Sequence, residues 1–163
     1  MPGLDAPGLY AWWADAEGAA DLTASLEVDI RLGRIYAGLT GATKWPSGRV
    51  GRATLKSRIG GNHLGGRIAG STFRLTLAAA LLSALDLQVI SSRKLEASSE
   101  QRLTEWMRRH LEVATFPFDD PDPLADLEDR VLGVLDPPLN LDGMPATPVR
   151  RRLAYLRQVV AQA

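Results

Sequence analysis

Two tyrosines lie near the middle of short segments that could form neighbouring strands. Tyr10 lies in residues 7–13 and Tyr36 in residues 34–39, with glycines in or beside both segments. Aromatic and β-branched residues cluster there without the three-to-four-residue apolar spacing of a helix. A tyrosine hydroxyl, with a pKa of about 10, is a poor base at neutral pH unless nearby cations lower that pKa. On these segments alone, two core strands with buried tyrosines are the simpler interpretation.

Basic residues form a block in the first half of the chain. Between positions 31 and 85 there is no acidic residue, but nine basic ones: Arg31, Arg34, Lys44, Arg49, Arg52, Lys56, Arg58, Arg67 and Arg74. The whole chain nevertheless has 19 basic and 19 acidic residues and no net charge. Such a block suits a polyanion such as nucleic acid. More often, however, such a run of charged residues lies on the solvent-exposed faces of unrelated helices.

Acidic residues form a second block later in the chain, with no base among them: Glu112, Asp119, Asp120, Asp122, Asp126, Glu128 and Asp129. This block could hold a divalent cation. Aspartates of a loop and first helical turn are ordinarily explained by capping and by the helix dipole. Glu128 lies about two turns into the expected helix and beside its apolar stripe, where a carboxylate calls for a cation or a hydrogen-bond partner. Among these acidic residues, Glu128 is therefore the one whose position is not explained by capping or by the helix dipole.

The composition indicates one ordinary domain covering residues 1–163. The chain is 45% hydrophobic and 23% charged, which suits a single core of this size. It has no cysteine and only two histidines, His63 and His110, so a metal would sit on carboxylate oxygen. The longest apolar stretch, residues 75–85, is too short to cross a bilayer, and the N-terminus lacks a secretory pattern. We expect a cytoplasmic protein without a membrane partner.

The order of the elements predicts an α+β fold with helices packed on a small, mixed or antiparallel, three-stranded sheet. The expected strands are 7–13, 34–39 and 113–118, and the expected helices are 19–26, 54–63, 71–85, 98–110, 122–135 and 147–163. Thr54, Ser71, Asp122 and Thr147 should cap their helices, and residues 98–101 offer a capping box. Residues 40–51 have the glycine and proline content of a loop. The prolines at 137 and 138 form a rigid turn that should present Asn140.

Five positions in this order carry a family resemblance. Gly8-Leu9-Tyr10, Tyr36-Ala37-Gly38, Arg58, Glu128 and Asn140 together resemble the GIY-YIG nuclease family over residues 8–140. The resemblance implies a metal-dependent DNA endonuclease in which Glu128 binds one Mg²⁺ or Mn²⁺ and Arg58 stabilises charge on the phosphate. It also implies that Tyr36 or Tyr10 activates or positions water, while Asn140 supports the site. Charge neutralisation of this kind is what phosphodiester hydrolysis needs.

Two positions depart from the family pattern. The family often has histidine or tyrosine four residues after the helical arginine, but Asn62 stands there and His63 is one residue further on. His63 is therefore a second-rank catalytic candidate. Repair-type members carry a lysine just after the second tripeptide, where this chain has Leu39. Lys44 or Lys56 could replace it, and we prefer Lys44.

Double-stranded DNA is the expected partner, contacted by Lys44, Arg49, Arg52, Lys56 and Arg67. The arginines of the last helix could also touch phosphates, although an exposed amphipathic helix is their simpler use. The main alternative is a catalytically inactive nucleic-acid-binding module of the same fold, and a protein-interaction domain is a third hypothesis. The presence of all five residue types favours the enzyme, because a pure binder needs no glutamate near a phosphate. The oligomeric state, the cleavage specificity and the pathway stay open.

Overall fold

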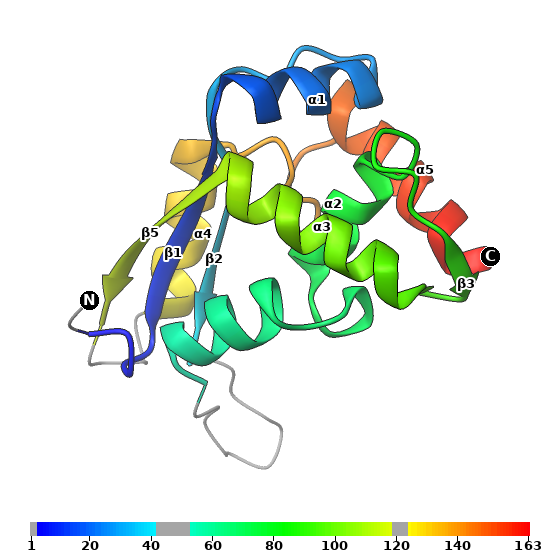
Figure 1. Cartoon of the computed structure of the whole chain (residues 1–163). Coiled ribbons are helices and arrows are strands. Elements are labelled where there is room, and N and C mark those ends of the chain that lie inside the picture. The colour runs from blue at the N-terminus through cyan, green and yellow to red at the C-terminus, as the bar shows by residue number, and fades with distance from the viewer. Residues whose placement is uncertain (1–2, 42–52, 119–123) are drawn as a thin grey trace.

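A three-stranded antiparallel sheet forms the left side of the molecule in Figure 1. The structure, a computed structural model, describes residues 3–41, 53–118 and 124–163, without the side chains of residues 124–126. The strands are β1 (Gly8–Ala14), β2 (Gly33–Thr40) and β5 (Leu111–Pro117), and β1 is the central one. The expected α+β fold is confirmed, and of the two expected kinds of sheet the antiparallel one is found.

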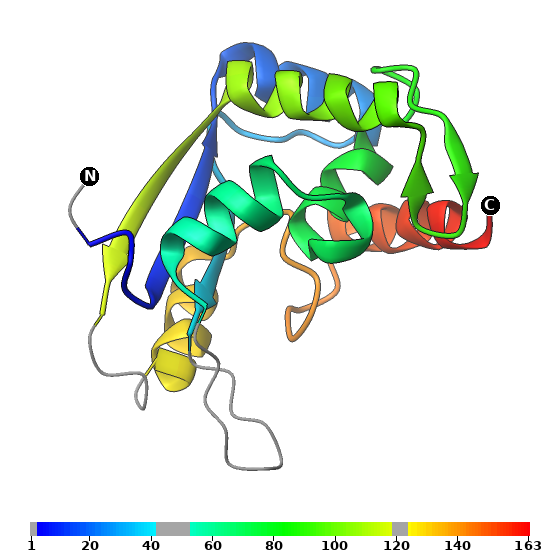
Figure 2. The same ribbon diagram turned by 60° about the horizontal axis from the view of Figure 1, so that its bottom comes forward.

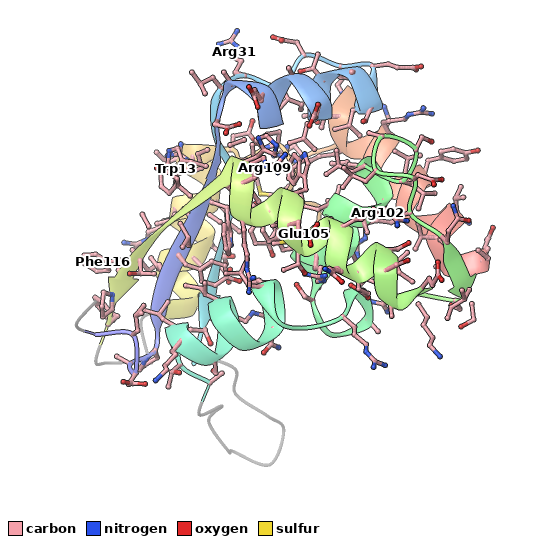
Figure 3. The ribbon with its side chains drawn as sticks, viewed as in Figure 1. Trp13, Arg31, Arg102, Glu105, Arg109 and Phe116 are labelled. Atoms are coloured by element: carbon pink, nitrogen blue, oxygen red, sulfur yellow. The ribbon has the colours of Figure 1, made fainter. Side chains whose placement is uncertain are left out.

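The register of the sheet places the two tyrosines on its buried face. Tyr10 lies opposite Gly38, and Trp12 lies opposite Tyr36. Side chains of a strand alternate between faces, so Tyr10 and Trp12 point the same way, and both are buried. The other face carries Trp13, which is half-buried. Figure 3 shows Trp13 on β1 and Phe116 on the neighbouring strand β5.

The helices cover both faces of the sheet. They are α1 (Ala16–Leu26), the π-helix η1 (Ser57–Leu64), the 3₁₀ turn η2 (Ile68–Gly70), α2 (Thr72–Ala80), α3 (Ala97–His110), α4 (Leu124–Leu135) and α5 (Pro148–Gln162). A short hairpin, β3 (Val89–Ser91) and β4 (Lys94–Leu95), precedes α3. Helices η1 and α3 lie on one side of the sheet and α4 on the other (Figures 1 and 2).

Helix α2 is the core helix, as its apolar sequence predicts. Eight of its nine residues are buried, and the ring of Phe73 stacks on Tyr36 and Trp12 with centroids 4.4 and 5.4 Å apart. Its expected extension to residue 85 is wrong, since the helix ends at Ala80 and the chain continues in turns to Asp86, which has a φ of 47°. The aromatic stack connects the core helix directly to β1 and β2.

Helix starts follow the capping residues with two exceptions. Ser71 and Thr147 accept hydrogen bonds from the third residue of their helices, as expected. Helix α1 begins three residues before the expected start, because Asp15 caps it and accepts from the Gly18 N–H at 2.7 Å. The capping box predicted at residues 98–101 is wrong, since α3 already begins at Ala97, and the Ser99 hydroxyl instead accepts from the Gln88 N–H. Asp122 lies outside the described residues.

No helix in the described ranges combines the length and apolar character needed to cross a membrane. The cytoplasmic location stays a prediction.

Candidate functional site

Two glycines make room for the tyrosines. A Cβ atom added to Gly38 would lie 2.8 Å from the hydroxyl oxygen of Tyr10, and one added to Gly8 would lie 2.3 Å from the Phe116 carbonyl oxygen. Contacts below 3.0 Å are not tolerated without a shift of the neighbouring atoms. Glycine is therefore required at Gly38 for the ring of Tyr10 and at Gly8 for the pairing with β5.

The Tyr10 hydroxyl is the centre of a buried hydrogen-bond chain. The Arg58 Nε–H donates to it at 3.4 Å, and His63 Nε2 lies 2.9 Å from it. On the other side of the ring, His63 Nδ1 lies 2.7 Å from the Ser71 hydroxyl, which also accepts from the Arg74 backbone N–H. Residues from β1, η1 and the start of α2 are thus held together at one point.

The π-helix explains why His63, rather than Asn62, reaches Tyr10. In η1 the Gly65 N–H donates to the Gly60 carbonyl at 2.8 Å, five residues back. A π-helix closes each turn with one residue more than an α-helix, and such turns are frequent at functional sites. The residue five positions after Arg58 therefore comes beside it. The π-helix therefore accommodates the one extra residue between Arg58 and His63, compared with the four-residue spacing expected from the sequence.

Burial determines the protonation states of His63, Tyr10 and Tyr36. It lowers the pKa of His63 to about 3, with further lowering by Arg58 and Arg74, so the imidazole is neutral at physiological pH. Burial also raises the pKa of Tyr10 and of Tyr36, and it outweighs the opposite effect of Arg58 on both. Both phenols are therefore protonated at neutral pH and can act as hydrogen-bond donors.

A cavity of about 260 Å³ joins four of the expected site residues. Tyr36, Arg58, Glu128 and Asn140 all line it, although they come from β2, η1, α4 and the loop after α4. Tyr10 is not among the residues that line this cavity. The two tyrosines therefore have different surroundings, since Tyr36 lines this cavity and Tyr10 lines a second hollow that Glu128 also lines.

Glu128 is a half-buried carboxylate on the inner side of α4. Burial raises its pKa, while the Leu39 backbone N–H, which donates to it, and the charge of Arg58 lower it. Asp129 lies next to it at the same cavity and raises its pKa by repulsion. Glu128 thus links α4 to the end of β2.

The donor set of the cavity fits a hydrated divalent cation. Mg²⁺ commonly keeps several waters and is held by one or two carboxylates together with a substrate phosphate. Glu128, Asp129 and Asp142 supply carboxylates around the cavity. Within the described ranges, no group of three or more His, Cys, Asp or Glu side chains could by itself hold a metal. The cavity therefore suits an ion that has one main protein ligand and takes its other ligands from water and the substrate.

Asn140 holds strand β2 in place beside the cavity. Its side-chain carbonyl accepts from the Ala37 N–H at 3.0 Å and its amide donates to the Ala37 carbonyl at 2.8 Å, so it pairs with the free edge of β2. The Arg150 side chain donates to the Asn140 carbonyl and to that of Pro137. Asn140 is a positioning residue, because both halves of its amide are used in holding β2.

Arg150 corrects one expectation about the last helix. The sequence places it with the exposed arginines, but only 4% of its surface is accessible. Its guanidinium donates to three backbone carbonyls and to the Asp136 carboxylate at 2.6 Å. It therefore holds the loop that carries Asn140 and is not available for phosphate.

The basic block does not form one surface. Arg74 is fully buried and paired with Glu100 at 2.9 Å, so its expected place in a polyanion surface is wrong. Lys56 is exposed near Asp5, and Arg67 lines a separate hollow beside the β3–β4 hairpin. Of the expected DNA contacts, Lys44, Arg49 and Arg52 lie outside the described residues. Among the described members of the block, Arg58 lines the cavity.

Three further charged residues line the cavity and were not expected there: Asp129, Asp142 and Arg157. Asp142 also raises the pKa of Tyr36 by its charge, which shows that the two lie close together. One sequence signal was present, because Asp142 follows Asn140 by two residues in the same rigid loop. Arg157 gives no such signal, since its place depends on how α5 packs.

Comparison with known proteins gives one family. The model of the GIY-YIG catalytic domain matches residues 8–159, nearly the whole chain. No curated protein and no solved structure matches the chain. The family match confirms the resemblance seen in the tyrosine tripeptides.

Proposed function

We propose that this chain, which belongs to the GIY-YIG family, is a divalent-metal-dependent endonuclease that hydrolyses phosphodiester bonds of double-stranded DNA. The family implies nuclease activity, and its nucleases generally depend on a divalent metal. The observation that supports the proposal is the cavity in which a half-buried carboxylate, a guanidinium and a protonated phenol meet. We further propose that the chain acts as one domain in the cytoplasm.

Glu128 and Arg58 would share the negative charge of the scissile phosphate. Glu128 would hold Mg²⁺ or Mn²⁺, which when bound offsets charge on the phosphate oxygens. The Nε–H of Arg58 is used by Tyr10, so its terminal amino groups are left for the phosphate. A guanidinium fixed in this way stabilises the charge that develops during attack.

Tyr36 would position the attacking water. Tyr36 lines the cavity, and its hydroxyl is protonated at neutral pH because burial raises its pKa. A protonated phenol cannot take a proton as a phenolate would, so its role here is to orient water by hydrogen bonding. Tyr10 and neutral His63 would hold Arg58 in place from behind. Lys44 stays a candidate from the sequence.

The alternative of an inactive nucleic-acid-binding module explains the cavity less well. A module that only binds phosphates gains from cationic side chains, whereas a carboxylate in the cavity would repel the phosphates. Glu128 is half-buried beside Arg58, and its desolvation must be offset. A metal that touches both the carboxylate and the phosphate provides that offset.

The test is metal-dependent cleavage by the Glu128→Gln variant. Wild-type protein is incubated with supercoiled, linear, single-stranded and branched DNA in Mg²⁺, Mn²⁺ or EDTA. We expect cleavage of duplex substrates with metal only, and its loss in Glu128→Gln by at least about 10²-fold. DNA affinity should be kept, because glutamine preserves shape and removes a negative charge.

Glu112→Gln is the matched control, since Glu112 is exposed on β5 and does not line the cavity. Asp122→Asn tests the acidic block. Near-normal nicking by Glu128→Gln, or loss of nicking only in Asp122→Asn, would show that the metal belongs to another acid. Absence of metal-dependent cleavage in the wild type on all four substrates would leave the inactive module as the better reading.

A further inference from the structure

A groove of about 560 Å³ runs along α5 beside the loop that follows Asn140. Leu141, Asp142 and Arg157 line both this groove and the catalytic cavity. The two hollows therefore meet at these residues. A chain-like ligand in the groove would reach Arg58 and Glu128 beside Arg157, which lies along α5 between Arg151 and the end of the helix that Arg93 contacts.

The spacing along α5 gives the groove its shape and its charge. Arg151, Ala154, Arg157 and Ala161 line it, at intervals of three or four residues that place them along one face of the helix. Alanine side chains between the arginines leave room for a ligand. Helical rise separates Arg151 from Arg157 by about 9 Å, the axial length of two to three nucleotides.

A third arginine enters the groove from the β3–β4 hairpin. The Arg93 N–H donates to the Val160 carbonyl, and the Ser92 hydroxyl donates to the Ala161 carbonyl at 2.7 Å, so the turn is fixed to the end of α5. Arg93 has a φ of 53°, a conformation that glycine or asparagine adopts at lower cost. The backbone therefore holds an exposed cation at the C-terminal end of α5, at the opposite end of the groove from Arg151.

Within the part of the chain that the structure describes, these three arginines differ from their neighbours in having no carboxylate partner. Arg150 is paired with Asp136, and Arg152 lies 3.8 Å from Glu27. Among the described residues, Arg93, Arg151 and Arg157 make no ion pair. Asp142 is the single acidic residue of the described lining and lies at the junction with the cavity. The groove thus carries excess positive charge along its length.

We propose that this groove binds the sugar-phosphate backbone of the DNA beside the bond that is cut, with phosphates on Arg151, Arg157 and Arg93 in that order along α5. The inference rests on the proposed function, because it identifies where the substrate of that site continues. Guanidinium groups suit phosphate oxygens through paired hydrogen bonds, and unpaired arginines can make those bonds without losing an internal partner. The apolar and small residues between them make no demand on base sequence, so this contact is independent of sequence.

The experiment compares the salt dependence of DNA binding in EDTA, where no cleavage occurs. Each protein is titrated on a duplex at several salt concentrations. Counterion release predicts that log affinity falls by about 0.9 per log unit of salt for each phosphate contact. The double variant Arg93→Gln, Arg151→Gln should therefore lose about 1.8 from the slope of the wild type and bind more weakly at low salt.

The matched control is Arg108→Gln, Arg109→Gln. Both residues are exposed on α3 and do not line the groove, and Arg109 is visible on that helix in Figure 3. This control removes the same charge, so an equal loss of slope would show a general charge effect and overturn the groove. Equal melting temperatures must accompany the comparison. Arg157→Gln is measured separately, because Arg157 also lines the cavity.

The outcomes separate the groove from the proposed function. Cleavage that depends on Glu128, with an unchanged slope in the groove variant, would overturn the groove and leave the nuclease. A reduced slope in a protein that never cleaves would support the groove and overturn the nuclease. A wild type without affinity for duplex DNA would overturn both.

Discussion

The Tyr10 and Tyr36 side chains lie on one face of the sheet and hydrogen-bond each other, but their other neighbours differ. Tyr10 contacts Arg58 and His63 inside the protein, whereas Tyr36 lines the cavity and stacks on Phe73. The sequence alone does not distinguish these roles, because both tyrosines occupy similar strand segments. The difference arises from η1, which packs against Tyr10 and leaves Tyr36 beside the cavity.

We predict that Tyr36→Phe lowers cleavage more than Tyr10→Phe does. Loss of the Tyr36 hydroxyl should reduce turnover on the order of 10²-fold with a smaller loss of stability than Tyr10→Phe, because it removes the hydrogen bond to Tyr10 but leaves Arg58 and His63 their partner. Tyr10→Phe should instead lower stability by about 1–3 kcal/mol, since it leaves the Arg58 Nε–H without its acceptor and the buried His63 Nε2 without its hydrogen-bond partner. Turnover and thermal unfolding of both variants provide the measurement, and full activity in both would exclude a tyrosine mechanism.

At the scale of elements, η1 shows what the sequence could and could not predict. Thr54 and the apolar spacing of Leu55 and Ile59 predict the helix almost to its observed end. The apolar pattern does not reveal its hydrogen-bond period, and Gly60 and Gly61 suggest termination instead of a widened turn. The placement of His63 beside Arg58 was therefore visible only in the structure.

Arg150 and Asn140 show the same limit in the loop after α4. The prolines at 137 and 138 correctly indicate a rigid turn that presents Asn140. An arginine in an amphipathic helix is ordinarily assigned to the surface, and no local signal shows that the turn leaves several carbonyls unpaired. Because those acceptors come together only on folding, the burial of Arg150 could not be predicted.

The neutral His63 held by η1 should make the protein sensitive to acid. Its pKa is about 3 when folded and about 6.5 when unfolded, so the unfolded chain binds the extra proton between these values. The stabilising effect is fully present above pH 6.5 and is lost as the pH falls toward 3. Between pH 7 and pH 5 the cost through His63 alone is about 2 kcal/mol.

We predict that His63→Gln flattens this part of the stability profile. Glutamine does not titrate, so its free energy of unfolding should fall by about 2 kcal/mol less than that of the wild type between pH 7 and pH 5. Urea unfolding at several pH values gives the measurement. Asn62→Ala is the control on the same helix and should keep the slope of the wild type. Parallel profiles for His63→Gln and the wild type would mean that His63 is not held neutral.

At the scale of the whole molecule, the net charge is zero, but the basic side chains occupy very different positions in the fold. Folding removes Arg74 and Arg150 from the surface and places Arg58 at the cavity. On α5 it leaves Arg151 exposed and Arg157 half-buried beside the groove. The sequence identifies the basic block but not this division, because the block is continuous only along the chain. Cations that position DNA and a cation that acts on the reacting phosphate should therefore have different effects when removed.

We predict that Arg58→Ala reduces turnover by about 10²- to 10³-fold with little loss of DNA affinity. Its guanidinium is fixed by Tyr10 beside Glu128, so its charge contributes most when negative charge develops on the phosphate. Lys44→Ala and Arg49→Ala should instead weaken binding modestly on all sequences and leave turnover at saturating DNA nearly unchanged, because loop cations position the backbone. Single-turnover rates and dissociation constants for the three variants separate the two effects. Equal losses of rate and affinity in all three would contradict the division, since a shared electrostatic field would then account for every cation alike.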